Sequence, residues 1–284
     1  MQPGARHPNP IHPRPLRLRR AELHVGLATR DGAAATAFYR DLMGFEELPP
    51  RSLGPLGDQR RVRIGGHEIR LYEFTEKPEV CPGGTERANG IRLLAFLLDD
   101  LDGLLARLDA AGHGYQRLRL PKGSPFQVAF STDADGNALE LVGLGRPAGD
   151  LLKTRMQIGL TVSDVARSRK FYGEALGLDE EPPMKLPEAM GVVGNERYGF
   201  RLGGTTVKFW SRRGGPLPTW TGKPSRRTGI RVIAGHVDDV DEAYANLVAR
   251  EVPIKMPPHD FEGRARLMFF ADPDGNWIEL GTRL

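Results

Sequence analysis

Apolar residues alternate with small or polar ones through residues 22–28 and 155–162, the pattern of a β-strand with one buried face. An aspartate follows each strand where a helix N-cap would stand, Asp31 or Asp164, and apolar residues then recur at helical spacing. Each predicted helix ends at a glycine, the residue type favoured in a left-handed C-cap: Gly44 and Gly177. Three short strands follow, so the pattern predicts a β-α-β-β-β unit at both places.

The same order starts again inside each half of the chain. In the first half, the second unit consists of a strand at 91–98, a helix at 100–111 and strands near 115–118, 126–131 and 137–142. The last two strands of each half flank a D-x-D-G-N turn, in which we expect Gly136 and Gly275 to take positive φ. The turn aspartates should accept hydrogen bonds from nearby backbone N–H groups. The chain therefore holds four units.

Offsets between matching segments measure the repeat. Residues 24–45 match 157–178 at a shift of 133, and the shift grows to 139 where 99–112 matches 238–251. The drift places about six extra residues in the second copy, five of them between its first helix and its third strand. We predict four segments: a disordered basic arm at 1–20, a first domain at 21–144, a linker at 145–154 and a second domain at 155–284.

Composition narrows the partners. The arm holds five Arg, five Pro and no acid, so it accounts for the formal net charge of +4 and leaves a body near −1, which argues against nucleic acid. No apolar run is long enough to span a bilayer, so no membrane partner is expected either. A single cysteine, Cys81, excludes an intramolecular disulfide and favours a reducing, cytoplasmic location. Nothing near it in sequence supplies the base or positive field of a catalytic thiolate.

Residues 21–144 and 155–283 resemble the vicinal oxygen chelate superfamily, which includes glyoxalase, extradiol dioxygenases and bleomycin-resistance proteins. The resemblance lies in HVGLATRD…FYRDLMGF, QIGLTVSD…FYGEALGL and the two D-x-D-G-N-x-x-E-L hairpins. It implies an α+β fold in which four β-α-β-β-β units form two curved open-barrel sheets with helices on the convex faces. The concave faces of that family hold a ligand and often a divalent metal.

Strand parity identifies the side chains that face these cavities. In the first copy they are His24, Arg70, Tyr72 and Glu140, and in the second Gln157, Lys208, Trp210 and Glu279. The resemblance places a first-strand metal ligand on His24 or Gln157 and a last-strand carboxylate on Glu140 or Glu279. The two remaining metal positions lack ligands, since they hold Arg70 or Lys208 and Leu93 or Val232.

Only His24 and Glu140 are thus strong metal ligands, whereas a catalytic site usually needs three protein ligands. A cation at the fourth-strand position would also repel a metal. Pairing the units across copies exchanges Glu140 with Glu279 but repairs nothing. Of the other histidines, only one is expected on a cavity side: His236, as against His67, His113 and His259.

Three interpretations of the cavities remain open. The charged residues could form buried ion pairs that replaced a metal, Arg70 with Glu140 and Lys208 with Glu279. They could instead bind a small anion under an aromatic wall, using Arg70, His24 and Tyr72, or Lys208, Gln157 and Trp210. The third interpretation is metal-free proton transfer by Glu140 and His24.

We favour a protein that binds a small anionic or aromatic molecule in concave-sheet cavities with degenerate metal sites, as a monomer or homodimer. The alternative is a divalent-metal-dependent lyase, isomerase or extradiol dioxygenase that uses His24 and Glu140 with iron, manganese, nickel or zinc. A scaffold with vestigial sites is the third hypothesis. Fold alone does not choose among them, because one fold hosts unrelated chemistries.

Overall fold

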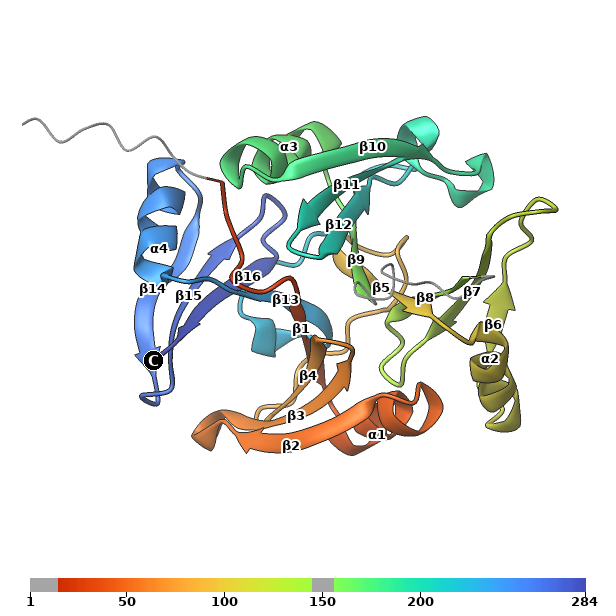
Figure 1. Ribbon diagram of the computed structural model, residues 1–284, viewed down its shortest axis with the longest axis horizontal. Helices are drawn as coiled ribbons and strands as arrows, with labels where there is room; N and C mark the ends of the chain where they lie inside the picture. The colour runs from red at the N-terminus through yellow and green to blue at the C-terminus, as the bar shows by residue number, and fades with distance from the viewer. Residues whose placement is uncertain (1–14, 145–155) are drawn as a thin grey trace, which may run out of the picture.

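The computed structural model describes residues 15–144 and 156–284, which form four β-α-β-β-β units as predicted (Figure 1). The first unit comprises β1 (His24–Thr29), α1 (Gly32–Ala37), β2 (Glu46–Ser52), β3 (Gly57–Ile64) and β4 (His67–Phe74). The second comprises β5 (Gly90–Leu98), α2 (Leu101–Ala110), β6 (Tyr115–Arg117), β7 (Phe126–Thr132) and β8 (Ala138–Leu144). The third comprises β9 (Met156–Thr161), α3 (Val165–Arg169), β10 (Asp179–Lys185), β11 (Glu196–Leu202) and β12 (Thr205–Trp210). The fourth comprises β13 (Gly229–His236), α4 (Val240–Ala249), β14 (Ile254–Phe261), β15 (Ala265–Ala271) and β16 (Trp277–Arg283).

The strands form two curved eight-stranded sheets, and each sheet takes one unit from each repeat. Sheet 1 has the order β14-β15-β16-β13-β1-β4-β3-β2 and joins the first unit to the fourth. Sheet 2 has the order β10-β11-β12-β9-β5-β8-β7-β6 and joins the second unit to the third. The joins are the antiparallel pairs β1–β13 and β5–β9. The division of the sequence into repeats therefore does not coincide with the division into sheets.

The predicted helix caps are confirmed. Asp31 Oδ1 accepts a hydrogen bond from Ala34 N at 2.9 Å, and Asp164 Oδ1 accepts one from Arg167 N at 3.0 Å. Gly44 follows the first helical segment with φ +75°, and its counterpart in the second repeat, Gly177, has φ +67°. The α-helical part is shorter than the spacing suggests, because a π-helical turn completes each segment, at Phe38–Leu42 and Lys170–Ala175.

One face of each sheet packs on the helices. In sheet 1 the side chains of Val25, Leu27, Ile69 and Leu71 are fully buried in an apolar core that α1 and α4 help to cover. The four helices lie around the outside of the molecule, so the concave faces point inward (Figure 1). The intervening residues of β1 and β4, among them His24 and Arg70, belong to the opposite, concave face.

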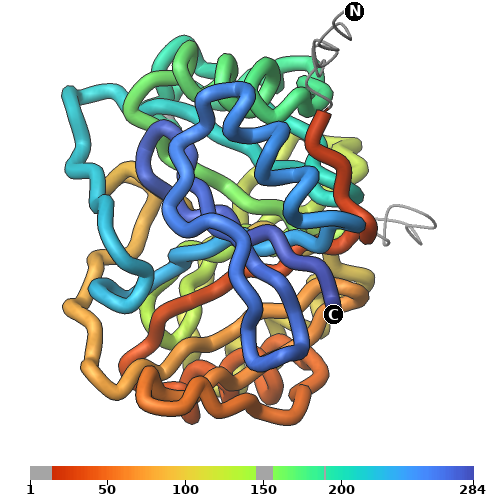
Figure 2. The backbone as a smooth tube through the Cα atoms, turned by 90° about the vertical axis from the view of Figure 1, so that its left-hand side faces the viewer, coloured from red at the N-terminus to blue at the C-terminus, as the bar shows by residue number. Residues whose placement is uncertain are grey.

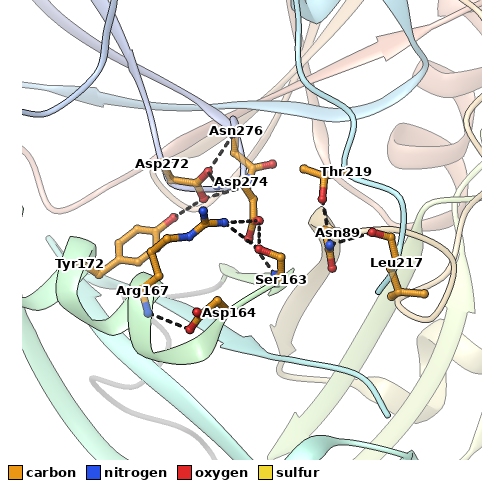
Figure 3. Close-up of polar contacts among 10 residues, drawn as sticks. All are labelled: Asn89, Ser163, Asp164, Arg167, Tyr172, Leu217, Thr219, Asp272, Asp274 and Asn276. Carbon is orange, nitrogen blue, oxygen red and sulfur yellow. Dashed lines mark hydrogen bonds and ion pairs between the residues drawn. The ribbon is translucent and has the colours of Figure 1, made fainter. Parts of the chain in front are cut away.

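The D-x-D-G-N turns connect the two sheets. Asp272, in the β15–β16 turn of sheet 1, accepts a hydrogen bond from the hydroxyl of Tyr172 at 3.0 Å, and Tyr172 belongs to the unit that builds sheet 2 (Figure 3). The first repeat does the same, since the hydroxyl of Tyr39 donates to Asp133 at 2.8 Å. Both turn glycines have φ +80°, as predicted. The repeated hairpin is therefore a structural clamp between sheets.

Further polar contacts hold the clamp of the second repeat. Asp274 accepts hydrogen bonds from the backbone N–H of Ser163 at 3.1 Å and from its hydroxyl at 2.5 Å, and it also contacts Arg167 (Figure 3). Asn276 Oδ1 accepts from the backbone N–H of Ile91, at the start of β5 in the other sheet, at 3.1 Å. The two sheets are thus fixed to one another by buried hydrogen bonds.

The N-terminal segment departs from prediction. Residues 1–14 of the predicted arm, like the predicted linker 145–154, lie outside the described residues, but residues 15–20 are placed and bonded. The backbone N–H of Leu16 donates to the carbonyl of Leu176 at 2.8 Å, and that of Arg19 donates to the carbonyl of His236 at 2.7 Å. Figure 2 shows this red segment beside the blue C-terminal unit. A cavity of about 570 Å³ is lined by this segment and by residues of α4. No described helix is long and apolar enough to cross a membrane.

Candidate functional site

Two neighbouring rows of side chains form the floor of the concave face of sheet 1. Strand register aligns His24 with Ala234 and Glu279 in one row, and Arg70 with Gly26, Val232 and Trp277 in the next. We call this floor site 1 and define it by six residues: His24, Glu68, Arg70, Tyr72, Trp277 and Glu279. They come from β1 and β4 of the first repeat and from β16 of the second.

Arg70 and Glu279 form the central ion pair of site 1. Arg70 Nη1 lies 2.8 Å from Glu279 Oε1, and the two side chains are 10% and 12% exposed. The expected pairs Arg70–Glu140 and Lys208–Glu279 are wrong, because β8 lies in sheet 2, where Glu140 is bonded to Lys208. The residue types of the two ion pairs were predicted, but their partners are exchanged because the units pair across repeats.

On each concave face an aromatic ring packs directly against a glycine of the neighbouring strand. A Cβ atom on Gly26 would come within 2.7 Å of Tyr72 Cε2, and one on Gly159 would come within 3.1 Å of Trp210 Cη2. A contact of 2.7 Å is too short for a Cβ atom, so a side chain at position 26 would displace the ring of Tyr72. Glycine therefore lets Tyr72 in sheet 1 and Trp210 in sheet 2 pack down on the neighbouring strand.

His24 is a neutral hydrogen-bond donor. Its Nδ1 accepts the backbone N–H of Glu68 at 3.0 Å, so the ring proton resides on Nε2. Burial, reinforced by the charge of Arg70, lowers the pKa of His24 to about 3. The ring of His236 stands edge-on to it with 5.3 Å between centroids, which confirms that His236 faces the cavity.

The donor set of site 1 does not fit a divalent metal. His24 and Glu140 belong to different sheets, so the hypothesis that they share a metal fails on topology. With Glu279 in place of Glu140, Arg70 still stands at the third position. A metal-binding histidine normally donates from its other ring nitrogen, whereas His24 accepts there.

Across residues 15–144 and 156–284, no group of three or more His, Cys, Asp or Glu side chains is arranged to hold a metal ion. Three other histidines each have a ring nitrogen within hydrogen-bond distance of a backbone carbonyl: His67 at Leu23, His113 at Thr132 and His259 at Pro257.

The equivalent floor of sheet 2, which we call site 2, contains Gln157, Lys208, Trp210 and Glu140 and is covered by protein. Val192, in the β10–β11 loop at 186–195, is fully buried against Leu93 and Trp210, and Leu186 and Met190 pack beside it. This loop contains the insertion that the repeat offsets revealed. The corresponding β2–β3 connection in sheet 1 spans only residues 53–56. The insertion thus fills site 2 with apolar side chains and leaves site 1 without such a cover.

Charge also distinguishes the two concave faces. By register, five arginines and three glutamates face the cavity of sheet 1: Arg51, Arg61, Arg63, Arg70 and Arg283, with Glu46, Glu68 and Glu279. Three of these arginines have uncharged counterparts in sheet 2, where Met184, Gly199 and Leu144 replace Arg51, Arg61 and Arg283. Sequence reasoning missed Arg51, Arg61, Arg63 and Glu46 because parity was not applied to the second and third strands. On the fourth and last strands it was applied to Arg70, Tyr72 and Glu279 but not extended to Glu68 and Arg283.

Two buried donors on the floor of site 1 have no hydrogen-bond acceptor in the described part of the chain. They are Arg70 Nε and Trp277 Nε1, which lie in the same row of the sheet. Buried donors in proteins are nearly always paired with protein, water or ligand. The ring of Phe269 lies next to that of Trp277, with 5.6 Å between centroids, and adds an apolar wall.

Comparisons with known proteins agree with this architecture. A family model described as the Glyoxalase/Bleomycin resistance protein/Dioxygenase superfamily matches residues 23–141 and 155–280. The uncharacterized protein YaeR of Escherichia coli is 31% identical over 121 residues, which cover 42% of this chain and 92% of that protein. Catechol-2,3-dioxygenase of Bacillus subtilis is 25% identical over 259 residues, 78% of this chain and 86% of that protein. Among solved structures, glyoxalase I from Zea mays matches with a TM-score of 0.67 at 18% identity, covering 93% of this chain and 92% of that one. At 18% identity, this structural similarity shows a shared fold and nothing more specific.

Proposed function

Because the chain belongs to the glyoxalase/bleomycin resistance protein/dioxygenase superfamily, we propose that it binds a small organic anion on the concave face of sheet 1 without a metal ion. One observation carries this proposal: arginine outnumbers acid on that face, and the excess is absent from the equivalent face of sheet 2. The five arginines exceed the three glutamates by two, and this excess of positive charge favours an anionic occupant, because clustered like charges repel one another.

Site 1 offers donors for one anionic group and rings for an apolar body. Arg70 Nε, which lies 3.9 Å from Glu68 Oε2, and Trp277 Nε1 are donors without a hydrogen-bond acceptor. His24 contributes a proton on Nε2 without adding charge. A carboxylate that accepts from these groups would form charge-assisted hydrogen bonds. Tyr72 and Phe269 would then flank the remainder of the ligand, which suits an aromatic or otherwise flat molecule.

Sheet 2 is the weaker candidate. The side chains of Val192, Met190 and Leu186 occupy the space above Trp210, so a ligand would have to displace the 186–195 loop. On the concave face of this sheet the cations Arg197, Arg201 and Lys208 are matched in number by Asp179, Glu181 and Glu140, so no cation is in excess. We therefore propose one ligand per chain, in site 1.

A metal-dependent lyase or dioxygenase receives no support from the donor set. The positions that resemble the family's metal ligands hold His24, Arg70, Val232 and Glu279 in site 1, and the protonated Nε2 of His24 leaves the carboxylate of Glu279 alone. Glu279 is in turn neutralised by Arg70.

Calorimetric titration with a panel of carboxylates and their neutral amides, in excess EDTA, tests the proposal. Benzoate with benzamide is the first pair. We expect the acid to bind at least about tenfold more tightly, the value of one charge-assisted hydrogen bond. The Arg70→Met/Glu279→Gln double variant, which removes both charges together, should lose that preference. Lys208→Met/Glu140→Gln, its counterpart in site 2, should keep it. If no acid in the panel binds better than its amide, or if EDTA abolishes binding, the proposal is wrong.

A further inference from the structure

We infer that the occupant of site 1 is a dianion, with its second negative charge held at the rim by Arg51 and Arg283. This inference rests on the proposed function and adds the charge class of the ligand. It depends on two residues outside the floor described above, on strands β2 and β16.

The ion pairs on this face do not include Arg51 or Arg283. Arg61 donates two hydrogen bonds to Glu68, at 3.1 and 3.2 Å. Arg63 forms the same bidentate interaction with Glu46. Arg70 takes Glu279. Three arginines therefore occupy the three glutamates, with Glu68 also 3.9 Å from Arg70 Nε. No carboxylate of the described residues forms an ion pair with Arg51 or Arg283.

Register places both side chains on the concave face of sheet 1, where both are exposed. Arg51 lies opposite Gln59 on β3, whose next neighbour across the sheet is Tyr72. Arg283 lies four residues beyond Glu279 on β16, and so on the same face. The curvature of the sheet brings the two rims together, since Arg51 is within electrostatic range of Arg61, Arg70 and Arg283. Partial burial and these three cations lower the pKa of Arg51, and the opposing effect of Glu68, which is already bonded to Arg61, does not outweigh them.

Sheet 2 shows that the fold does not require these arginines. At the same positions sheet 2 has Met184 and Leu144, on strands with the same pairing. Arginine at both rim positions of sheet 1 is therefore a property of site 1. One monoanion would neutralise one of the two surplus cations, whereas a ligand with two negative charges would match both.

The test uses isophthalate and its monoamide, which have the same shape and differ by one charge. Titrations at pH 7.5 in EDTA would compare the wild type with an Arg51→Met/Arg283→Leu variant that carries the residues found at these positions in sheet 2. A matched control, Arg87→Leu/Arg119→Met, removes two exposed arginines elsewhere. We expect the wild type and the control to prefer isophthalate by about tenfold or more. In Arg51→Met/Arg283→Leu, the preference should fall to about threefold or less while affinity for the monoamide changes little.

Each contrary result has a distinct meaning. If the wild type binds both ligands equally, the dianion inference is overturned while the proposed function stands. If the preference survives in Arg51→Met/Arg283→Leu, the assignment to the rim is overturned. If the wild type binds neither isophthalate nor its monoamide, nor any acid of the earlier panel, the proposed function fails and this inference fails with it.

Discussion

Replacing His24 with glutamine should flatten the acid side of the protein's stability curve. The equivalent position of the second repeat holds Gln157, so the fold already accepts this side chain between the same strands. Glutamine can still offer an oxygen to the backbone N–H of Glu68, the group that His24 Nδ1 now satisfies at 3.0 Å. It cannot take up a proton.

The size of the effect follows from the two pKa values of His24. The folded-state pKa is about 3, against 6.5 for the free side chain, and the residue is only 6% exposed. Because the folded value is depressed, the unfolded state binds the extra proton, and stability falls as pH drops below 6.5. Each pH unit costs about 1.4 kcal/mol, so the loss due to His24 is about 2 kcal/mol at pH 5.

Urea unfolding of the wild type and His24→Gln at pH 7.5 and pH 5.0 would measure this term. The difference between the two proteins should shift by about 2 kcal/mol in favour of the variant on acidification. Other titrating groups, such as Asp272, are common to both proteins and cancel in the difference. Equal pH dependence of the two proteins would refute the assignment of His24 as a buried neutral donor.

Three further predictions concern the clamp, the floor glycines and metal. Tyr172→Phe should cost about 1–3 kcal/mol in urea unfolding, because it removes a donor from buried Asp272. Burial raises the pKa of Asp272 to about 6, so the folded state binds its proton more tightly, and the deficit should narrow from pH 7 to pH 5; a deficit that widens would contradict this. Gly26→Ala should weaken benzoate binding, because the added Cβ would displace Tyr72. The matched variant Gly159→Ala should leave benzoate binding intact, and each variant should lose about 1–3 kcal/mol of stability, as overpacked sites usually do. Equal benzoate binding by the two variants would count against site 1. Protein offered zinc, nickel, manganese or iron and then desalted should retain well below one equivalent by mass spectrometry, and near-stoichiometric metal lost in Glu279→Ala would overturn the metal-free site.

Local features of this fold could be predicted because they depend on neighbouring residues. Asp31 and Asp164 cap helices, Gly136 and Gly275 take positive φ, and parity put Arg70 on the cavity side without any knowledge of the partner strands. The pairing between units could not be predicted in this way. All four units present similar apolar strands, and Glu140 and Glu279 are equally suitable partners for a buried cation, so nothing local distinguished the two arrangements.

The orientation of Arg51 was missed for an identifiable reason. Pro49 and Pro50 interrupt β2, and the register shifts between Leu48 and Arg51, so alternation along that strand does not reveal which way Arg51 faces. The offset of the repeats did reveal the insertion at 186–195. Its position over Trp210 depends on tertiary packing, which spacing does not encode.

The exchange of units between sheets has a consequence for synthesis of the chain. Arg70 and Glu279, whose pairing joins the first unit to the fourth, are 209 residues apart in sequence. At translation rates of about 5–20 residues per second, roughly 10–40 s separate the emergence of β4 from that of β16. Through that interval β1 is an open strand edge, whereas sheet 2, built from two consecutive units, can already close. Sheet 1, the one that carries the proposed site, is therefore expected to form last, around a finished sheet 2.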